Sequence, residues 1–407
     1  MRVAFFHPHF KGVGGAEVLI ASQARYLVEH GHDVRLITEI RDPARWEHAF
    51  AGVTHSAFQT YLPREWFLPR AVRIEHALPR AVERMQGSDA VIAHNFPSCA
   101  LLGMADLPHT TGVWYCNEPN RQLHLVKSTP FLHARVSAHP PHSAAERAYV
   151  HKLRLHQLLT STALGRQTRE LDREHSAKVA IIVANSQYTR DNVARIYQRA
   201  DAHVIPPIIE FPRAGRDRTG IDRTRGLQVL AHARLDPIKN IEHVVKGFAL
   251  YAHKARSAQL HVVGVGKQRR ELERLSAQLG IAAAVRFHGF LPQPELERVY
   301  DACDVFALTP LDEPFGMVFP EAAARGLILI GTDHAGPAEI LDGGALGYPC
   351  DPFAPEALAE QLQRIAAESD AHHDALRERA AAACFSRYSA STLGPMLAQL
   401  LATPRFR

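Results

Sequence analysis

An alternation of apolar strands and amphipathic helices runs along this chain, stops once, and then starts again. The first series begins with a buried strand over Arg2–Pro8 and a helix over Gly15–His30, and it continues to the apolar run Lys178–Asn185. The polar, glycine-containing stretch Phe211–Arg225 interrupts it, and a second series begins at Leu227–Ala233. Strands that alternate with helices form β-α-β units with parallel sheets. The pattern therefore predicts an α/β protein with two such sheets.

The remaining elements follow from the period of the hydrophobic residues. In the first half, runs of strand length lie at Asp33–Thr38, Asp89–Asn95 and Thr111–Cys116, and the long helical stretch Ser143–Ser176 is expected to break at Gly165. In the second half, the strands expected after the first are Leu260–Gly264, Val285–Gly289, Val305–Thr309 and Leu327–Gly331. The helices expected between the strands are Ile241–Ala255, Gln268–Leu279, Pro294–Ala302 and Phe319–Arg325.

The length of the chain agrees with two domains, because a single hydrophobic core seldom grows beyond about 250–300 residues. The chain has 407 residues. We place one Rossmann-like domain at residues 1–205 and a second at 206–385. The remaining residues, 386–407, carry a helix over Ser389–Ala402 that follows the end of the main pattern.

The composition excludes several classes of protein. Hydrophobic residues make up 46% and charged residues 22% of the chain, the balance of a soluble globular enzyme. The first residues lack the charged and apolar regions of a signal peptide, and no apolar run approaches the length that crosses a bilayer. The five cysteines are odd in number and form no C-x-x-C pair, which favours a reducing cytoplasm over a disulfide framework or zinc site.

The mild basic excess, a net charge of +5, is concentrated in one segment. Arg121–Lys178 contains ten Lys and Arg against four Asp and Glu, with seven histidines among them. Such a segment either contacts the anionic headgroups of a membrane or an acidic acceptor, or it is simply a solvated helical face, and the sequence leaves these alternatives open. Nucleic acid is not expected, since no nucleic-acid-binding module accompanies the charge.

A glycine-rich turn, Gly12-Val13-Gly14-Gly15, joins the first strand to the first helix. Glycines there allow close approach of a ligand, and the helix that follows presents free N–H groups to an anion. The spacing is not G-x-G-x-x-G, and no acidic residue stands out at the end of the second strand to hold a ribose. Taken alone, the turn is more typical of an ordinary strand-to-helix connection than of a ligand site.

Two basic residues follow the first strand of the second series. Arg234 and Lys239 lie in the turn Arg234–Asn240, at the edge of the sheet where parallel α/β proteins bind their ligands. Arginine offers a two-pronged fork and lysine a point charge, so both suit a diphosphate. The alternative is a pair of surface salt bridges.

The most specific motif is a pair of carboxylates, Glu313 and Glu321, eight positions apart around an apolar turn. The first follows a strand, and the second lies near the start of the next helix. The backbone N–H groups of Gly316–Val318 would then form a second anion site. One carboxylate is suited to the hydroxyls of a sugar and the other to a ribose, which we favour over a solvated pair.

In this combination the sequence resembles the family 4 glycosyltransferases, retaining enzymes of the GT-B fold. The residues that carry the resemblance are Gly14-Gly15, Arg234 with Lys239, and the E-x7-E motif of Glu313 and Glu321. The resemblance implies two Rossmann-like domains that face a central cleft, with the acceptor bound by residues 1–205 and the nucleotide sugar by residues 206–385. It also implies that the helix within 386–407 crosses back onto the first domain.

The resemblance further implies a role for each motif residue. Arg234 and Lys239 would hold the diphosphate, Glu321 the ribose hydroxyls and Glu313 the transferred sugar. The other donor-binding residues implied in the same way are Gly14, Gly15, Gly264, Phe290, Leu291, Phe315, Gly316, Met317 and Val318. Among these, Phe290 and Leu291 would lie near the nucleobase.

The acceptor side departs from the pattern of the family. Many relatives have a histidine close to the sugar where this chain has Asn117, in Tyr115-Cys116-Asn117-Glu118-Pro119. An amide donates hydrogen bonds but does not accept a proton as imidazole does. We therefore consider His94, at the end of the preceding strand, as a contributor in its place, with Asn117 retained as a contact of the sugar. Glu118 and Arg121 are candidate contacts of the acceptor.

The implied reaction transfers a hexose from GDP-mannose or a UDP-hexose to a glycan or a lipid-linked acceptor, by front-face attack. No D-x-D triplet occurs in the chain, so we expect no metal ion and no other cofactor. We expect a cytoplasmic protein, with peripheral contact with the anionic inner face of the membrane as the alternative that the basic segment leaves open. The other functions considered are an NAD(P) oxidoreductase, a GT-B epimerase or phosphorylase, and a non-catalytic protein that binds glycans or lipids.

Overall fold

A computed structural model describes residues 1–10, 14–40, 46, 49–65, 67–211 and 224–403 of the chain. The described residues form two compact units. The first comprises Met1–Pro130, Lys152–Ile208 and the segment that begins at Ser389, and the second comprises Phe131–His151 and Ile209–Tyr388. Phe131–His151 therefore belongs to the second unit, although it lies within the first predicted domain, residues 1–205.

The first unit is built on a parallel sheet in the order β3-β2-β1-β4-β5-β6-β7. Its strands are β1 (Arg2–Phe10), β2 (Asp33–Ile40), β3 (Thr54–Ala57), β4 (Ala90–His94), β5 (Thr111–Cys116), β6 (Ile181–Ala184) and β7 (His203–Val204). Every residue of β4 and β6 is buried, as expected for strands that are covered by helices on both faces.

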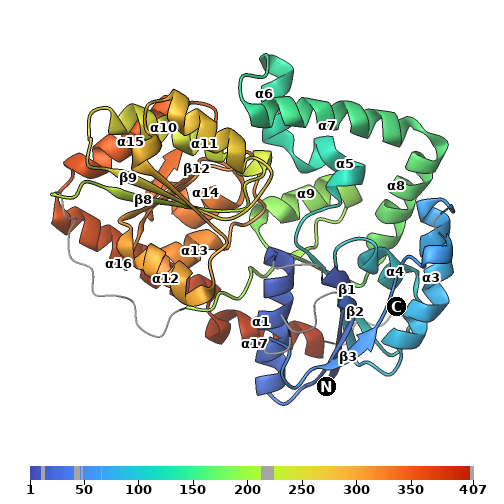
Figure 1. Cartoon of the computed structure of the whole chain (residues 1–407). Coiled ribbons are helices and arrows are strands. Elements are labelled where there is room, and N and C mark those ends of the chain that lie inside the picture. Colours follow the sequence, from blue (N-terminus) through green and yellow to red (C-terminus); the bar gives the residue numbers. More distant parts are fainter. Residues whose placement is uncertain (11–13, 41–45, 47–48, 66, 212–223, 404–407) are drawn as a thin grey trace. The chain divides into compact units, whose positions relative to one another are not determined.

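The helices of the first unit lie on both faces of its sheet, with α1 and α17 on one face and α3, α4 and α8 on the other (Figure 1). They are α1 (Gly15–Glu29), α3 (Arg70–Met85), α4 (Ser98–Met104), α5 (Arg121–Ser128), α8 (Ala163–Ser176), α9 (Gln187–Tyr197) and α17 (Ala390–Ala402). Ser186 caps α9, because its Oγ accepts the amide N–H of Thr189 at 3.0 Å. Helix α17 packs on α1, as the predicted fold requires, so closely that a Cβ on Gly394 would lie 2.1 Å from the Tyr26 ring.

The second unit repeats the same plan, with a parallel sheet in the order β10-β9-β8-β11-β12-β13. Its strands are β8 (Gln228–His232), β9 (Gln259–Val263), β10 (Val285–Gly289), β11 (Val305–Leu308), β12 (Ile328–Thr332) and β13 (Tyr348–Cys350). Helices α10, α11 and α15 cover one face, and α12, α13 and α16 cover the other (Figure 1). These helices, with α14, are α10 (Ile241–Ala252), α11 (Arg269–Gln278), α12 (Gln293–Ala302), α13 (Val318–Ala324), α14 (Ala335–Leu341), α15 (Pro355–Ala367) and α16 (Asp370–Tyr388).

Two further helices, α6 (Pro130–Ala138) and α7 (Ala144–Ser161), bring Phe131–His151 onto the second unit. The guanidinium group of Arg135 pairs with Glu146 at 3.1 Å and lies 5.0 Å from the centre of the Phe353 ring. The Phe131 ring packs against the ring of His334, with 4.6 Å between their centres. These contacts attach the segment to the second unit.

The predicted break of the long helical stretch at Gly165 is wrong by three residues. Helix α7 ends at Ser161, and Thr162 caps α8 by accepting the N–H of Gly165 at 3.0 Å. Gly165 lies within the first turn of α8, where only glycine fits: a Cβ on it would lie 1.9 Å from the carbonyl oxygen of Leu159. This glycine permits a close contact between helices and does not end one.

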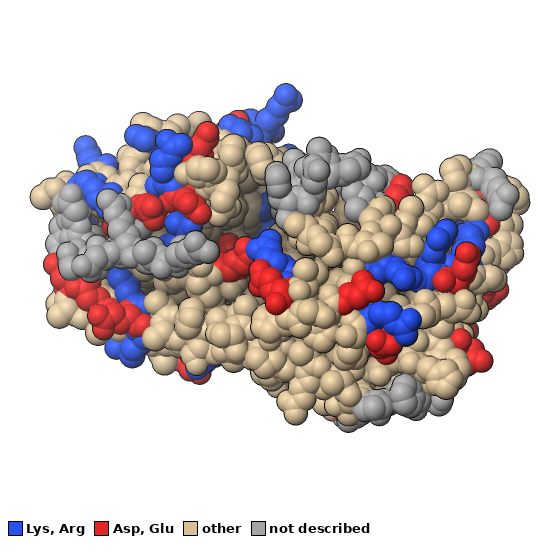
Figure 2. Space-filling model, turned by 90° about the horizontal axis from the view of Figure 1, so that it is seen from below, with Lys and Arg blue, Asp and Glu red and all other residues tan. Residues whose placement is uncertain are grey.

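The surface charge of the described residues is mixed on the face that Figure 2 presents. Acidic and basic side chains lie side by side over this face, with uncharged areas between them. The net charge of +5 is thus not gathered there into one basic area. Of the helices that the structure describes, none is both long and apolar enough to span a membrane.

Candidate functional site

The carboxyl ends of the strands of the second sheet carry most of the predicted site residues. Parallel strands end at the same edge of a sheet, so the loops that follow β8, β9, β10 and β11 are neighbours there. Arg234 follows β8, and its side chain is 70% exposed with an ion pair to Asp236 at 3.0 Å. An exposed arginine of this kind is able to turn towards a ligand without breaking any buried contact.

Lys239 and Glu313 form an ion pair at this edge, although they lie far apart in the chain. Their side chains are 23% and 14% exposed, so the pair is half-buried and poorly screened by water. Lys239 ends a short 3-10 helix, Pro237–Lys239, and Glu313 lies in the loop after β11. The structure therefore brings together the basic turn and the first carboxylate of the E-x7-E motif.

Asn240 holds the lysine turn in place. Its backbone has φ +58°, a left-handed conformation that asparagine tolerates better than most residues. Its buried side-chain amide donates to the carbonyl oxygens of Thr309 at 3.0 Å and Pro352 at 2.8 Å. The amide thus ties the end of β8 to the end of β11, and it fixes the distance between the two halves of the ion pair. Sequence reasoning missed this residue, because a single asparagine after a lysine carries no distinctive signal.

The turn between the two glutamates is fixed from behind by the start of α14. Gly336 donates its N–H to the carbonyl oxygen of Glu313 at 2.9 Å, and a Cβ at Gly336 would lie 2.4 Å from the Cα of Phe315. The Phe315 ring is buried against Tyr388, edge to face at 5.2 Å. Gly316 has φ +94°, which favours glycine. Phe315 is therefore an anchor of the turn, while Met317 and Val318 lie at the start of α13.

Glu321, the second carboxylate, lies in the first turn of α13. Burial of its carboxyl group raises its pKa to about 7; Arg325, one turn further on, lowers the pKa and Glu210 raises it. Arg325 also pairs with Glu297 at 2.8 Å, so its charge is shared. A carboxyl group with a pKa near neutrality is available both as an acceptor and as a donor of hydrogen bonds.

Two glycines allow the loops after β8 and β9 to touch. Gly264 has φ +125°, and a Cβ there would lie 1.9 Å from the carbonyl oxygen of Ala233. Gly266 is similarly crowded against Leu235. Gly264 thus brings the backbone of its loop next to the turn that carries Arg234.

The loop after β10 exposes an aromatic ring at the same edge. The Phe290 side chain is 64% exposed, and Leu291 beside it is half-buried. An exposed phenylalanine offers a face on which a flat ring can stack.

Two histidines near this edge were not predicted as site residues. The buried ring of His334 is held by the carbonyl oxygen of Leu311 at 3.1 Å and by Asp333 at 3.0 Å. His232, at the end of β8, is bonded to the hydroxyl of Tyr300 at 2.9 Å, and burial lowers its pKa to about 4. His232 is therefore neutral at pH 7. The one signal in the sequence was the position of each at the end of a strand.

In the first unit, Gly14 and Gly15 form the start of α1. Gly14 is the residue before the helix and has an extended backbone, and Gly15 is exposed. A Cβ on Gly14 would lie 2.6 Å from a carboxylate oxygen of Glu17, which itself faces the buried ring of His7 at 3.9 Å. Gly12 and Val13, the rest of the predicted turn, lie outside the described residues.

The burial of His94 argues against the direct role in the chemistry that the sequence suggested. Its side chain has no exposed surface. Its ring stacks on the rings of Phe5 and Tyr115, with 6.0 Å and 5.2 Å between the ring centres. Burial lowers its pKa well below the ordinary value, so the ring stays neutral. The end of β4 is covered by its neighbours, which the sequence alone did not reveal.

Asn117, Glu118 and Arg121 follow β5 in one loop. The backbone carbonyl of Asn117 accepts from the side chain of Asn185 at 2.8 Å, while its own Nδ2 is buried and has no partner among the described residues. Glu118 and Arg121 pair with each other at 2.7 Å. The loop therefore offers one unused amide donor and one partly exposed ion pair.

Comparison with known protein families agrees with this architecture. Residues 13–211 match the model described as Glycosyltransferase Family 4, and residues 218–383 match the model described as Glycosyl transferases group 1. A similar curated protein is mannosylfructose-phosphate synthase from Agrobacterium fabrum, which is 29% identical over 201 residues, or 45% of this chain and 44% of that protein. The chain thus spans less than half the length of this relative.

Solved structures match over nearly the whole chain. HepE from Anabaena, crystallised with UDP, aligns with a TM-score of 0.69 at 18% identity, covering 99% of this chain and 100% of that one. WaaG, a glycosyltransferase involved in lipopolysaccharide biosynthesis, aligns with a TM-score of 0.67 at 18% identity, covering 99% and 100%. The predicted GT-B fold is confirmed.

Proposed function

Because the chain belongs to the family 4 glycosyltransferases, we propose that it transfers a hexose from a nucleotide diphosphate sugar to an acceptor with retention of configuration. The observation that carries the proposal is the ion pair between Lys239 and Glu313 at the ligand-binding edge of the second sheet. A half-buried cation beside a half-buried carboxylate suits a donor that presents a diphosphate next to a polyol. The matching solved structures share the fold, and HepE holds UDP.

The second unit would bind the donor. Lys239 would turn from Glu313 to the diphosphate, and the exposed Arg234 would join it. Glu313, released from the lysine, would accept hydrogen bonds from the hydroxyls of the sugar. Before the donor binds, the ion pair would thus keep both side chains ordered. Because they are already ordered, less conformational entropy is lost when the diphosphate and the sugar become their new partners.

The other predicted donor contacts fit around this pair. Glu321 would accept from the ribose hydroxyls, and the amides of Gly316, Met317 and Val318 would face the sugar or the phosphates. Gly264 would bring its loop close to the diphosphate, and Phe290 with Leu291 would lie against the base. From the first unit, Gly14 and Gly15 would approach the donor phosphates.

The transfer itself would be a front-face substitution at C1 of the donor sugar. The bond from C1 to the diphosphate oxygen breaks, the acceptor hydroxyl forms a new bond on the same face, and its proton passes to a phosphate oxygen of the leaving group. Lys239 and Arg234 would stabilise the charge that grows on the diphosphate, and the protein would otherwise act by positioning. We expect this to proceed without a metal ion.

The acceptor would be a glycan or a lipid-linked sugar, contacted through the loop after β5. The unused amide of Asn117 is a hydrogen-bond donor for a hydroxyl, and Glu118 with Arg121 offers a charged pair beside it. Proton transfer through Asn117 is not part of the proposal. For the donor we propose a UDP-hexose or GDP-mannose, with UDP-glucose as the first to be tested.

The test is the release of free nucleoside diphosphate from a panel of nucleotide sugars. One donor should raise the thermal midpoint of the protein and be hydrolysed slowly without acceptor. Lys239→Ala and Glu313→Ala should each abolish release while the protein stays folded. Lys246→Ala is the matched control, because Lys246 pairs with Glu242 on α10 within the same unit. Near-normal release by either site variant would refute the role of that residue.

A further inference from the structure

Four exposed leucines gather where α7 meets α8. Leu155, Leu158 and Leu159 lie on one face of α7, at the spacing that places helical side chains next to one another. Leu164 lies at the start of α8. Their exposed fractions are 48%, 66%, 56% and 55%. We call these four residues the leucine corner; clustered apolar side chains of this size usually mark a surface that is covered by something else.

The leucine corner includes a close contact between α7 and α8. Gly165, in the first turn of α8, packs so closely on the carbonyl oxygen of Leu159 that a Cβ would lie 1.9 Å from it. On the inner side of α7, Thr160 is buried, and the ring of His156 is bonded to the carbonyl oxygen of Leu123 at 3.1 Å. The inner side of this helix therefore contacts the first unit through Thr160 and His156. The leucines on its outer face are exposed.

The segment that forms the leucine corner carries charge of one sign. The segment 152–169 contains Lys152, Arg154, Arg166 and Arg169 and no acidic residue. Lys152, Arg154 and Arg166 are exposed. A leucine patch bordered by cations fits a surface that is apolar inside and anionic outside.

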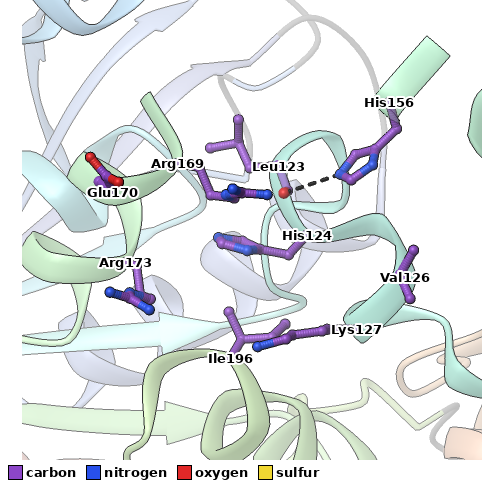
Figure 3. A pocket seen from close by; sticks show the side chains of 9 residues that line it. All are labelled: Leu123, His124, Val126, Lys127, His156, Arg169, Glu170, Arg173 and Ile196. Atoms are coloured by element: carbon purple, nitrogen blue, oxygen red, sulfur yellow. Dashed lines mark hydrogen bonds between the residues drawn. The ribbon is translucent and has the colours of Figure 1, made fainter. Parts of the chain in front are cut away.

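A basic pocket adjoins the leucine corner. It has a volume of about 450 Å³ and is bounded by α5, α7, α8 and α9. Its nine lining residues, drawn in Figure 3, are Leu123, His124, Val126, Lys127, His156, Arg169, Glu170, Arg173 and Ile196. Lys127, Arg169 and Arg173 lie around it, and Glu170 is the one carboxylate among these residues. His156 comes from the same turn of α7 as Leu155 and Leu159.

The buried carboxylate that pairs with His124, a residue of the pocket wall, is already satisfied. The carboxylate of Asp172 accepts from His124 at 2.7 Å and from the hydroxyl of Tyr197 at 2.9 Å, and all three residues are buried. Asp172 therefore pairs within the core and not with the arginines at the rim. Among the residues that line the pocket, the three cations Lys127, Arg169 and Arg173 thus outnumber the single carboxylate of Glu170, which favours an anionic group such as a lipid phosphate.

We infer that the leucine corner and the basic pocket dock this protein on an anionic phospholipid bilayer. The leucines enter the boundary of the acyl chains, while the lysine and arginines contact lipid phosphates. The inference rests on the proposed function only for its purpose, which is to bring the enzyme to a lipid-linked acceptor. A second copy of the chain is a poorer occupant, because a two-fold contact through this corner would set two basic rims against each other.

The experiment is co-sedimentation of the full chain with vesicles. Vesicles of phosphatidylglycerol and phosphatidylcholine should retain the protein at low salt, and vesicles of phosphatidylcholine alone should retain about tenfold less. The variant Leu158→Gln should lower retention about tenfold, and Arg169→Gln with Arg173→Gln should weaken it and flatten its salt dependence. Leu250→Gln, at an exposed leucine on α10, is the matched control and should bind normally.

Three results would overturn the inference. One is equal binding by Leu158→Gln and the wild type, and another is binding that ignores the charge of the lipid. The third is a dimer in the absence of vesicles that Leu158→Gln dissociates. Release of UDP from UDP-glucose in solution should be unchanged in Leu158→Gln. If no variant releases a nucleoside diphosphate but vesicle binding behaves as described, the proposed function fails and the docking surface stands.

Discussion

Replacing Glu321 by glutamine should make the unliganded protein more stable at pH 8 and a poorer binder of its donor. Burial holds the pKa of this carboxyl group at about 7, well above its ordinary 4.5. Between these two values the unfolded chain has lost the proton while the folded protein keeps it. Stability therefore falls as the pH rises from about 4.5 to about 7, and the full loss is present above that. Glutamine carries no such penalty.

The size of the effect follows from the two pKa values. A difference of one pKa unit corresponds to about 1.4 kcal/mol. The raised pKa accordingly destabilises the folded state by about 3 kcal/mol at pH 8 and by about 1 kcal/mol at pH 5. For a unit of this size, each kcal/mol moves the thermal midpoint by about 2–4 °C. The thermal midpoint of Glu321→Gln should thus exceed that of the wild type at pH 8. This difference in midpoint should be about 4–8 °C larger at pH 8 than at pH 5.

The assay is thermal unfolding followed by circular dichroism at the two pH values, without donor. Comparing the variant with the wild type at each pH cancels the titration of every other group. Donor binding, measured in parallel, should weaken because glutamine replaces an acceptor of the ribose hydroxyls by a group with one fewer acceptor oxygen. A midpoint difference that is the same at pH 5 and pH 8 would show that the carboxyl group is not buried as described.

The remaining predictions concern the ion pair, the tight loop and the thiols. Lys239→Met should weaken donor binding about tenfold or more and lower stability, because it leaves Glu313 unpaired. The double variant Lys239→Met with Glu313→Gln should recover the stability but not the transfer activity. Thermal melts measure the first effect, and release of nucleoside diphosphate measures the second. Gly264→Ala should lower the thermal midpoint far more than Gly280→Ala, since a Cβ meets a carbonyl oxygen at the first position and nothing within 4 Å at the second. The five free cysteines are buried, so they should react with a thiol reagent only after denaturation.

The fold was largely predictable because buried parallel strands are short apolar runs. Thr111–Cys116 and Val285–Gly289 match the observed strands end for end. Gly165 misled the prediction because glycine serves both to end a helix and to let two helices touch, and only the packing on Leu159 distinguishes the two. The position of Phe131–His151 was equally hidden, since it depends on contacts with residues about 200 positions away.

The site was predictable as a set of motifs but not as a set of contacts. Lys239 and Glu313 were each identified from their own surroundings, yet nothing in either segment indicates that they pair across 74 positions. The burial of His94 was not predicted, because it depends on Phe5 and Tyr115, which lie on the neighbouring strands. The raised pKa of Glu321 depends on burial in the same way.

The position of Phe131–His151 on the second unit has a consequence for recombination. An exchange of halves between relatives at the linker near residue 211 would carry over the second sheet without the segment that packs on it. His334 and Phe353 would lose the aromatic and cationic partners they have here, and Glu242 would lose the amide of Ala144, 2.9 Å from its carboxylate. Functional chimeras should therefore require that both segments come from one parent. Residues that appear in sequence to belong to the first unit must therefore be exchanged together with the second.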